Sequence, residues 1–358
     1  MTPRLRVSPV ASAVSRLLAA QRIGLRVGRQ IANRFGSGKE IYFGDRVDQY
    51  RKLWAAAADE MGASVKELAP DAWEISLGDR STRVFNYQVE LDNPVTLRLA
   101  GRKPLVHAML RDAGLPIPPH LRFDLATLDT AARFLSEEDS PCVVKPAGGY
   151  GGRGVTTHVE DERGLRRAAL LASLEDDSLL IERQVPGESL RVLVLRGRAL
   201  HAVVRSGRRV VGDGKLDVEA LCAGANPVIR IDRDARMTLA AQGIALIDVP
   251  RSGRAVLVKS LPPEAPERSE LRTVYDTEMT GRLHPEFEQA AVRAASVVGS
   301  ELAGVDFIAV DSTQPLFGNA FLNEVNTTPA FHHHYDSARE SHPEVAVAVL
   351  RELLGVAS

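Results

Sequence analysis

The most constraining feature of this sequence is a pair of strand-like segments, GVDFIAV at 304–310 and FLNEVN at 321–326. The segment between them contains proline, glycine and asparagine, which favour turns. We therefore predict an antiparallel hairpin centred near residue 315, with Asp306 directly across from Glu324. Residues two apart in a strand point to the same side, so Asn326 is expected on the same face as Glu324.

This hairpin would bring two carboxylates and an amide oxygen together. Carboxylates at short range repel each other unless a cation lies between them. All three groups are hard oxygen ligands, which suit magnesium held jointly by protein and phosphates. A solvent-facing sheet edge is the alternative, and we interpret Asp306, Glu324 and Asn326 as a magnesium site.

The remaining segments alternate between helical and hairpin patterns. Amphipathic periodicity predicts helices at 46–63, 102–113, 127–139, 161–175, 284–302 and 343–357. Strand patterns occur at 141–147, 178–185 and 189–205, and a hairpin is indicated at 72–87. This mixture predicts the α+β fold class with mainly antiparallel sheets, rather than a doubly wound parallel sheet.

Length and composition narrow the possible roles. A chain of 358 residues, 44% of them hydrophobic, can form two or three domains. Its 45 basic and 46 acidic residues leave no basic excess of the kind that nucleic-acid binding favours. The two cysteines, Cys142 and Cys222, lack CxxC spacing, which favours a reducing cytosol over a disulfide framework or zinc. No apolar run reaches the roughly 18 residues of a membrane span.

The first 39 residues contain arginines and serines but no acidic residue. An organellar transit peptide and an amphipathic surface helix both have this composition. The periodic pattern continues to Phe35 without a cleavage-like break, which favours the helix.

A glycine-rich segment follows Lys145, with glycines at 148, 149, 151, 152 and 154. Glycine lets backbone N–H groups approach a phosphate closely, and Lys145 can add a point charge. A lid that closes over a nucleotide would need such a hinge. A flexible surface loop is the alternative, and neither the P-loop spacing nor GxGxxG is matched.

The segment 178–195 runs from a strand through a Pro-Gly turn into a second strand. An edge strand could offer backbone groups to adenine, and Glu188 could bind ribose, although an ordinary hairpin corner with solvated charges is the favoured interpretation of this segment taken alone. Arg191 interrupts an apolar strand, on the face opposite Leu190 and Val192. A charge there requires a partner, either a structural carboxylate or a phosphoryl group.

Several motifs resemble the ATP-grasp superfamily in order and spacing, especially the ligase core of cyanophycin synthetases. They are VVKPAGGYGGRGV, LIERQVPGESLRVLV, VVGDGKLDVEAL, LHPEF and GVDFIAV with FLNEVNTTPA, and EVNTTP is also similar to D-alanine–D-alanine ligases. The resemblance covers about residues 98–350. The preceding residues look more like the stand-alone peptide ligases of the pheganomycin type.

The resemblance implies an ATP-grasp fold in which two α+β subdomains clamp ATP. The expected divisions are an N-terminal α/β domain at 1–97, a central lid subdomain at 98–183 and a C-terminal subdomain with the metal site at 184–358. The implied activity is that of a carboxylate–amine ligase. ATP phosphorylates a carboxylate, an amine attacks the acyl phosphate, and an amide, ADP and phosphate result.

The resemblance also implies roles for individual residues. ATP phosphates would be held by two lysines and covered by the lid glycines, adenine and ribose would be bound at the hinge, and magnesium at the hairpin. The lysines are Lys103 and Lys145, and the lid glycines are Gly149, Gly152 and Gly154. The hinge residues for adenine are Glu182, Arg183 and Val185, with Glu188 for ribose, and the magnesium ligands are Asp306, Glu324 and Asn326. Arg191 would face the transferring phosphoryl group, and Arg191 or Arg205 would stabilise the tetrahedral intermediate.

The chain departs from the family near the second substrate. The family usually has Pro-Gly after Asn-Thr, whereas Ala330 follows Pro329 here. Three adjacent histidines, 332–334, cannot converge on one point from a strand, which disfavours zinc. A polar pocket rim is the simplest interpretation, and His332 is a candidate for substrate binding or proton transfer. Asp213 and Lys215 would border the acceptor site, although an Asp-Gly turn explains them equally well.

Three functions remain as hypotheses. They are a peptide-forming ligase of natural-product biosynthesis or of general dipeptide synthesis, a kinase that phosphorylates a hydroxyl, and a nucleotide-binding module without turnover. The expected cofactors are ATP and Mg²⁺, for which Mn²⁺ can substitute. The expected partners are a carboxylate and an amino-acid or peptide amine, with no nucleic acid and no membrane. A cytoplasmic location and a homodimer complete these expectations.

Overall fold

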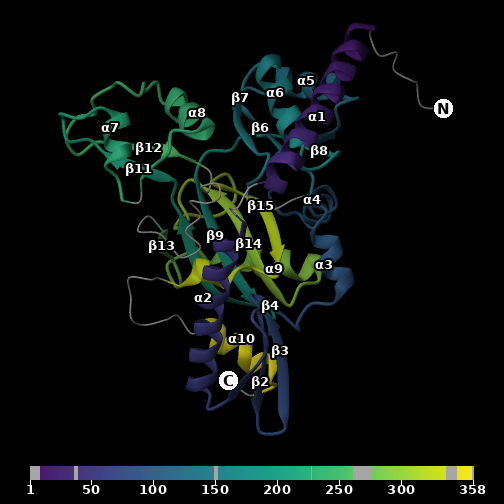
Figure 1. The fold of residues 1–358 in the computed structure, drawn as a ribbon, viewed down its shortest axis with the longest axis vertical. Helices are drawn as coiled ribbons and strands as arrows, with labels where there is room; N and C mark the ends of the chain where they lie inside the picture. Colours follow the sequence, from purple (N-terminus) through teal and green to yellow (C-terminus); the bar gives the residue numbers. More distant parts are fainter. Residues whose placement is uncertain are drawn as a thin grey trace. The chain divides into compact units, whose positions relative to one another are not determined.

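The structure is a computed structural model that describes residues 9–35, 39–148, 152–226, 228–260, 276–335 and 345–356. The chain forms two compact units, each built from three segments (Figure 1). Unit 1 comprises Met1–Phe35, Pro118–Val185 and Gly207–Glu264, and unit 2 comprises Gly36–Ile117, Pro186–Ser206 and Ala265–Ser358. The units interleave along the chain, whereas the three expected domains (1–97, 98–183 and 184–358) are contiguous, and that division stays a prediction.

Unit 1 contains a four-stranded antiparallel sheet in the order β5-β8-β6-β7. Its strands are β5 (His120–Phe123), β6 (Cys142–Pro146), β7 (Thr156–Val159) and β8 (Leu179–Arg183). Helices α5 (Leu128–Glu137) and α6 (Glu162–Ala172) bury their apolar stripes against it. The helices at 127–139 and 161–175 and both strands predicted from the sequence are therefore confirmed.

Helix α1 (Pro9–Phe35) belongs to the same unit and contacts α5 and α6. Leu18 is buried in the core that these helices share. Arg22 and Arg26 form ion pairs with Asp177 at 2.9 and 3.1 Å. This stretch therefore forms the amphipathic surface helix that the sequence pattern favours.

The rest of unit 1 is a two-stranded sheet, β11 (Arg208–Val211) with β12 (Ala255–Lys259), and helices α7 (Val218–Ala223) and α8 (Arg233–Ala241). These elements enclose a separate small core that includes Val218, Leu239 and Val258. Helix α8 begins after Asp232, whose carboxylate accepts a hydrogen bond from the Ala235 backbone N–H. This cap satisfies one of the donors that every helix leaves open at its start.

Unit 2 is built on a five-stranded sheet in the order β13-β10-β9-β14-β15. The strands are β9 (Glu188–Leu195), β10 (Arg198–Arg205), β13 (Asp276–Glu278), β14 (Leu302–Ala309) and β15 (Ala320–Thr327). One face is covered by α9 (Pro285–Val298), with α3 (Pro94–Ala100) and α4 (Lys103–Asp112) beside it. The predicted helix at 284–302 is confirmed, and the strand pattern at 189–205 forms the antiparallel pair β9 and β10.

The opposite face of this sheet packs against the remaining elements of unit 2. These are α2 (Lys39–Glu60), a four-stranded meander, the 3₁₀ turn η1 (Phe331–His334) and α10 (Val345–Leu353). The meander consists of β1 (Ser64–Ala69), β2 (Ala72–Leu77), β3 (Arg80–Phe85) and β4 (Gln88–Val89), so the predicted hairpin at 72–87 is its centre.

The two faces of β9 separate as the period of two predicts. Leu190, Val192 and Val194 join the core under α9, whereas Leu193 and Leu195 join the core with α2 and α10. Arg191 shares the second face. Strand β9 therefore presents the charged Arg191 on the same face as the apolar Leu193 and Leu195.

The structure corrects the expected position of strand β8. Strand β8 lies inside its sheet, between β5 and β6, so the predicted edge strand is wrong. The segment that covers it, β5, follows three prolines and has too short a pattern to be predicted. In the part of the chain that the structure describes, no helix combines the length and apolar character needed to cross a membrane.

The Pro-Gly turn before β9 requires glycine at 187, where φ is +128° and a Cβ atom would overlap the Ala309 backbone carbonyl. Substituting Gly187 by alanine should therefore lower the free energy of unfolding by about 2 to 4 kcal/mol, from backbone strain and overpacking. Gly197→Ala is the matched control, because Gly197 has φ +73° and open space around its Cα. Urea denaturation that gives equal losses for both variants would contradict the close approach.

Candidate active site

The predicted hairpin forms with the predicted register. Asp306 on β14 lies across from Glu324 on β15, and Gly304 lies across from Asn326. On its other side, Asp306 lies across from Arg191 on β9. Strands β9, β14 and β15, which are neighbours in the sheet (Figure 1), therefore place these polar groups on one face.

Arg191 and Asp306 form a buried bidentate ion pair. The Nε and one terminal nitrogen of Arg191 donate to the two carboxylate oxygens of Asp306, each at 2.7 Å. The two residues are 7% and 8% exposed. Burial opposes the charge of Arg191, but Asp306 and Glu324 outweigh it and raise the pKa of the guanidinium above its ordinary value. Asp306 therefore fixes a permanently charged guanidinium in one orientation.

The other two predicted ligands lie next to this pair. The Asn326 amide donates to Asp306 Oδ2 at 3.1 Å and to the Gly304 carbonyl at 3.3 Å. Lys103, at the first turn of α4, pairs with Glu324 Oε1 at 2.8 Å. The set thus alternates cations and carboxylates, an arrangement that neutralises like charges brought close together.

The donor chemistry of this set fits magnesium. Asp306, Glu324 and Asn326 supply two carboxylates and an amide oxygen, which are hard ligands. Three protein ligands leave positions for water and for phosphate oxygens, as is usual for Mg²⁺. Among the described residues, no group of three or more His, Cys, Asp and Glu side chains forms a cluster of the kind that holds a metal through those side chains alone. The hairpin therefore suits an ion shared with a substrate.

Gly304 is a site residue that the sequence analysis missed. A Cβ atom there would lie 2.9 Å from Pro329 Cβ and 3.6 Å from the Cδ of Arg191. Glycine within a strand often marks such a close approach of other atoms, and this was the available signal. Pro329 thus occupies the space that a side chain at position 304 would need, and Arg191 packs beside it.

In unit 1, Lys145 on β6 forms a second buried pair. Its Nζ lies 2.7 Å from Glu182 Oε1 on the neighbouring strand β8, and both side chains are 7% exposed. The other carboxylate oxygen of Glu182 is buried without a hydrogen-bond partner among the described residues. A buried acceptor without a partner is costly, and a bound donor group would satisfy it.

Fewer backbone groups at the end of β8 are available to bind adenine than the sequence predicted. The backbone N–H groups of Arg183 and Gln184 donate to the carbonyls of Pro119 and Pro141 at 2.9 and 2.8 Å. Those two donors are therefore occupied by backbone in this structure. The contacts expected of Val185 with adenine, and of Glu188 at the start of β9 with ribose, stay predictions.

Two of the lid glycines are described, and Gly149 lies outside the described residues. Gly152 and Gly154 both have φ +72°, which side chains rarely adopt. They border a cavity of about 330 Å³ in unit 1 that Thr156, Glu175 and Lys259 also line. At Gly152 and Gly154 the backbone thus adopts the conformation for which glycine is suited.

Substituting Gly152 by valine is expected to raise the KM for ATP about tenfold or more, because the loop could not keep its positive φ. Gly243→Val is the control, since Gly243 has φ +66° with nothing near its Cα, also in unit 1. Steady-state kinetics with a melting curve separates the two effects. Equal kinetics for both variants would place the loop away from the nucleotide.

The three histidines lie on the 3₁₀ turn η1 rather than on a strand, which corrects the predicted local structure. Thr328, with φ +51°, precedes Pro329 and ends β15 before them. His332 is buried with its Nδ1 2.9 Å from the Tyr50 hydroxyl, and His334 Nδ1 lies 2.9 Å from His201 Nδ1. Tyr50 and His201 were not predicted, because both lie far away in the chain.

His333 and Arg205 border the same face of the sheet. Burial, followed by the positive charge of Arg205, lowers the pKa of His333 well below its ordinary value. Arg205 is on β10, where it lies across from Ser189 of β9. It is two residues beyond Val203, which lies across from Arg191. The face therefore gathers two arginines and a neutral imidazole.

Asp213 and Lys215 lie in unit 1 and form a local turn. The Asp213 carboxylate accepts hydrogen bonds from the backbone N–H groups of Lys215 and Leu216, both at 2.8 Å. These bonds lower the pKa of Asp213. The turn interpretation is confirmed, and a role in an acceptor site stays a prediction.

The chain is similar in sequence to known ligases. No protein-family model matches the chain. It is 26% identical over 280 residues to a cyanophycin synthetase of Crocosphaera subtropica, covering 72% of this chain and 30% of that protein. It is 27% identical over 263 residues to the glutathione biosynthesis bifunctional protein GshAB of Streptococcus mutans, covering 68% and 34%.

The chain thus spans about a third of the length of these curated relatives. A bifunctional glutathione synthetase from Pasteurella multocida superposes with a TM-score of 0.55 at 21% identity, covering 85% of this chain and 43% of that one. The chain therefore resembles ATP-grasp carboxylate–amine ligases in sequence over about 70% of its length, and its α+β architecture is the ATP-grasp fold.

Proposed function

We propose that this chain is an ATP-dependent carboxylate–amine ligase. It transfers the γ-phosphoryl group of ATP to a carboxylate and joins the acyl phosphate to the amine of an amino acid or peptide. ADP and phosphate are the other products. The observation that carries the proposal is the Arg191–Asp306 pair beside the Lys103–Glu324 pair, whose two carboxylates face each other on β14 and β15.

Phosphoryl transfer depends mainly on positioning and charge neutralisation, so such an array suits it. Asp306, Glu324 and Asn326 would hold Mg²⁺, which supplies neutralising charge to the phosphates when bound. Arg191, oriented by Asp306, would stabilise the phosphoryl group and the oxyanion of the tetrahedral intermediate. Lys103 would contact a phosphate oxygen.

Unit 1 would supply nucleotide contacts. Lys145 would bind a phosphate, and the partnerless oxygen of Glu182 would accept a hydrogen bond from the exocyclic amino group of adenine. The backbone around Gly152 and Gly154 would cover the phosphates, because its positive φ values allow N–H groups to converge.

The substrates belong to the proposal as well. A peptide ligase of natural-product biosynthesis is the first choice, and a general amino-acid or dipeptide ligase is second. Mn²⁺ would replace Mg²⁺, since both accept oxygen ligands in similar geometry. A cytoplasmic location agrees with two buried cysteines that form no disulfide. A homodimer is the proposed assembly.

An ADP-release assay with a panel of carboxylic acids, run with and without hydroxylamine, tests the activity. An acyl phosphate yields a hydroxamate, so ADP release with hydroxamate formation is the expected result. ADP release without hydroxamate would instead indicate phosphorylation of a hydroxyl, and no ADP release with any acid would indicate a binding module. Mass spectrometry of products from a mixed amino-acid pool then identifies the amine.

A further inference from the structure

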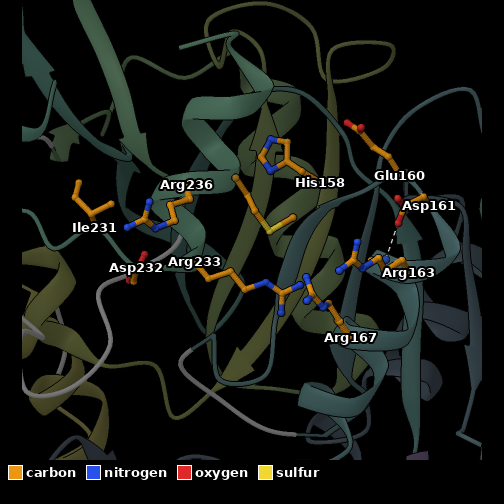
Figure 2. A pocket seen from close by; sticks show the side chains of 11 residues that line it. His158, Glu160, Asp161, Arg163, Arg167, Ile231, Asp232, Arg233 and Arg236 are labelled. Atoms are coloured by element: carbon orange, nitrogen blue, oxygen red, sulfur yellow. Dashed lines mark hydrogen bonds between the residues drawn. The ribbon is translucent and has the colours of Figure 1, made fainter. Parts of the chain in front are cut away.

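A cavity of about 740 Å³ in unit 1 is lined by the first turns of α6 and α8 and by the end of β7 (Figure 2). Four arginines reach it, Arg163 and Arg167 from α6 and Arg233 and Arg236 from α8. None of the residues assigned above to ATP, magnesium or the second substrate lines this cavity.

The four guanidinium groups have no partner among the residues that the structure describes. None of them forms a hydrogen bond or ion pair with any residue in the described part of the chain. Figure 2 shows the side chains of Arg163, Arg167 and Arg233 pointing toward one another. Burial and the charge of Arg167 lower the pKa of Arg233. Like charges held together in this way repel, and an anion between them would relieve the repulsion.

The carboxylates at the cavity are already engaged. Asp161 caps α6 by accepting from the Gly164 N–H at 2.6 Å, and Asp232 caps α8 and pairs with Lys259. Glu160 points away from the arginines in Figure 2. The imidazole of His158 adds no charge, because burial lowers its pKa. The cavity therefore carries a net positive charge.

The lining also restricts the class of anion. A planar guanidinium binds carboxylate or phosphate through two parallel hydrogen bonds. His158 is the only ring in the lining, so a nucleotide base would find no Phe, Tyr or Trp on which to stack. The volume is that of a site for a ligand larger than one phosphate ion. A concave site also suits a chain better than a flat lipid surface.

We propose that this pocket binds an acidic peptide segment, whose side-chain carboxylates pair with Arg163, Arg167, Arg233 and Arg236. The choice of a peptide rests on the proposed function, in which a peptide is a substrate. The pocket would bind acidic residues of that substrate other than the one that reacts. Such a contact would add affinity and selectivity without taking part in the reaction.

Fluorescence anisotropy of a labelled hexaglutamate peptide, measured without ATP, tests the binding directly. The variants are Arg167→Gln, Arg233→Gln and the double variant. Arg166→Gln is the matched control, because Arg166 lies on the same helix, pairs with Glu162 and does not line the cavity. A labelled hexaglutamine peptide measures binding that is independent of charge, and melting curves verify folding.

We expect each single variant to weaken hexaglutamate binding about fivefold and the double variant by about 20-fold, as for partly exposed charge pairs. Arg166→Gln should bind like the wild-type chain, and Arg167→Lys with Arg233→Lys should retain more binding than the glutamine pair. Equal losses for Arg166→Gln, or no binding of the peptide, would overturn the proposal. So would tighter arginine-dependent binding of pyrophosphate, oligothymidine or anionic vesicles. Because no turnover is measured, a failure here is distinct from a failure of the ligase assay.

Discussion

Replacing Arg191 by lysine is expected to lower kcat about a hundredfold or more while ATP affinity changes little. Lysine keeps the charge but cannot reproduce the two 2.7 Å hydrogen bonds to Asp306. Its ammonium is a point charge, whereas a guanidinium presents a planar fork to a phosphoryl group. The deficit therefore falls on the transition state rather than on nucleotide binding.

Single-turnover kinetics, ATP binding by calorimetry and melting curves together check this result. Arg198→Lys is the control, since Arg198 lies in the same sheet but is 60% exposed and only loosely paired with Glu352. A variant that melts earlier but keeps its kcat would show that Arg191 is structural. The proposed contact of this residue with the phosphoryl group would then be wrong.

Glu324→Gln is expected to lower the turnover rate about a hundredfold or more at limiting Mg²⁺. The substitution keeps the shape of the side chain and removes one charge from the proposed ligand set. It also leaves Lys103, 2.8 Å away, without its carboxylate partner. Excess Mg²⁺ should restore part of the rate, because the variant should still bind the ion, although with lower affinity.

The titration of rate against Mg²⁺ concentration is the decisive measurement. Glu301→Gln is the control, because Glu301 is an exposed carboxylate of unit 2 paired with Arg196 at 3.7 Å. Normal turnover of Glu324→Gln at limiting Mg²⁺ would remove Glu324 from the metal site. A loss that no Mg²⁺ concentration relieves would indicate instead that Glu324 acts by orienting Lys103.

The sequence predicted those parts of the site that depend on local pattern. The hairpin register of Asp306 and Glu324 followed from two strand patterns around one turn, and the two faces of β9 followed from the period of two. The pairing of Arg191 with Asp306 did not, because β9 and β14 are adjacent in the sheet although 115 residues separate the two side chains. Their proximity is a property of the sheet order, which no local pattern encodes.

Two short strands were missed for the same reason. Strand β13 has three residues and β5 has four, so neither shows a pattern long enough to recognise. Each gains its hydrogen bonds from a partner strand that is distant in the sequence. The histidines of η1 were predicted as part of a strand because nothing in the sequence marks the positive φ of Thr328. The local structure of these segments therefore depends on tertiary contacts.

The interleaving of the two units has a consequence for the order in which the chain can fold during synthesis. Helix α1 is synthesised before the sheet on which Leu18 packs, which is complete only after β8, more than 140 residues later. The core that α2 shares with α10 needs Val349 and Leu350, which are synthesised after all the other described elements. Neither unit can therefore finish folding before the other has begun. Nascent chains of intermediate length would expose apolar surface and depend on chaperones more than chains with contiguous domains.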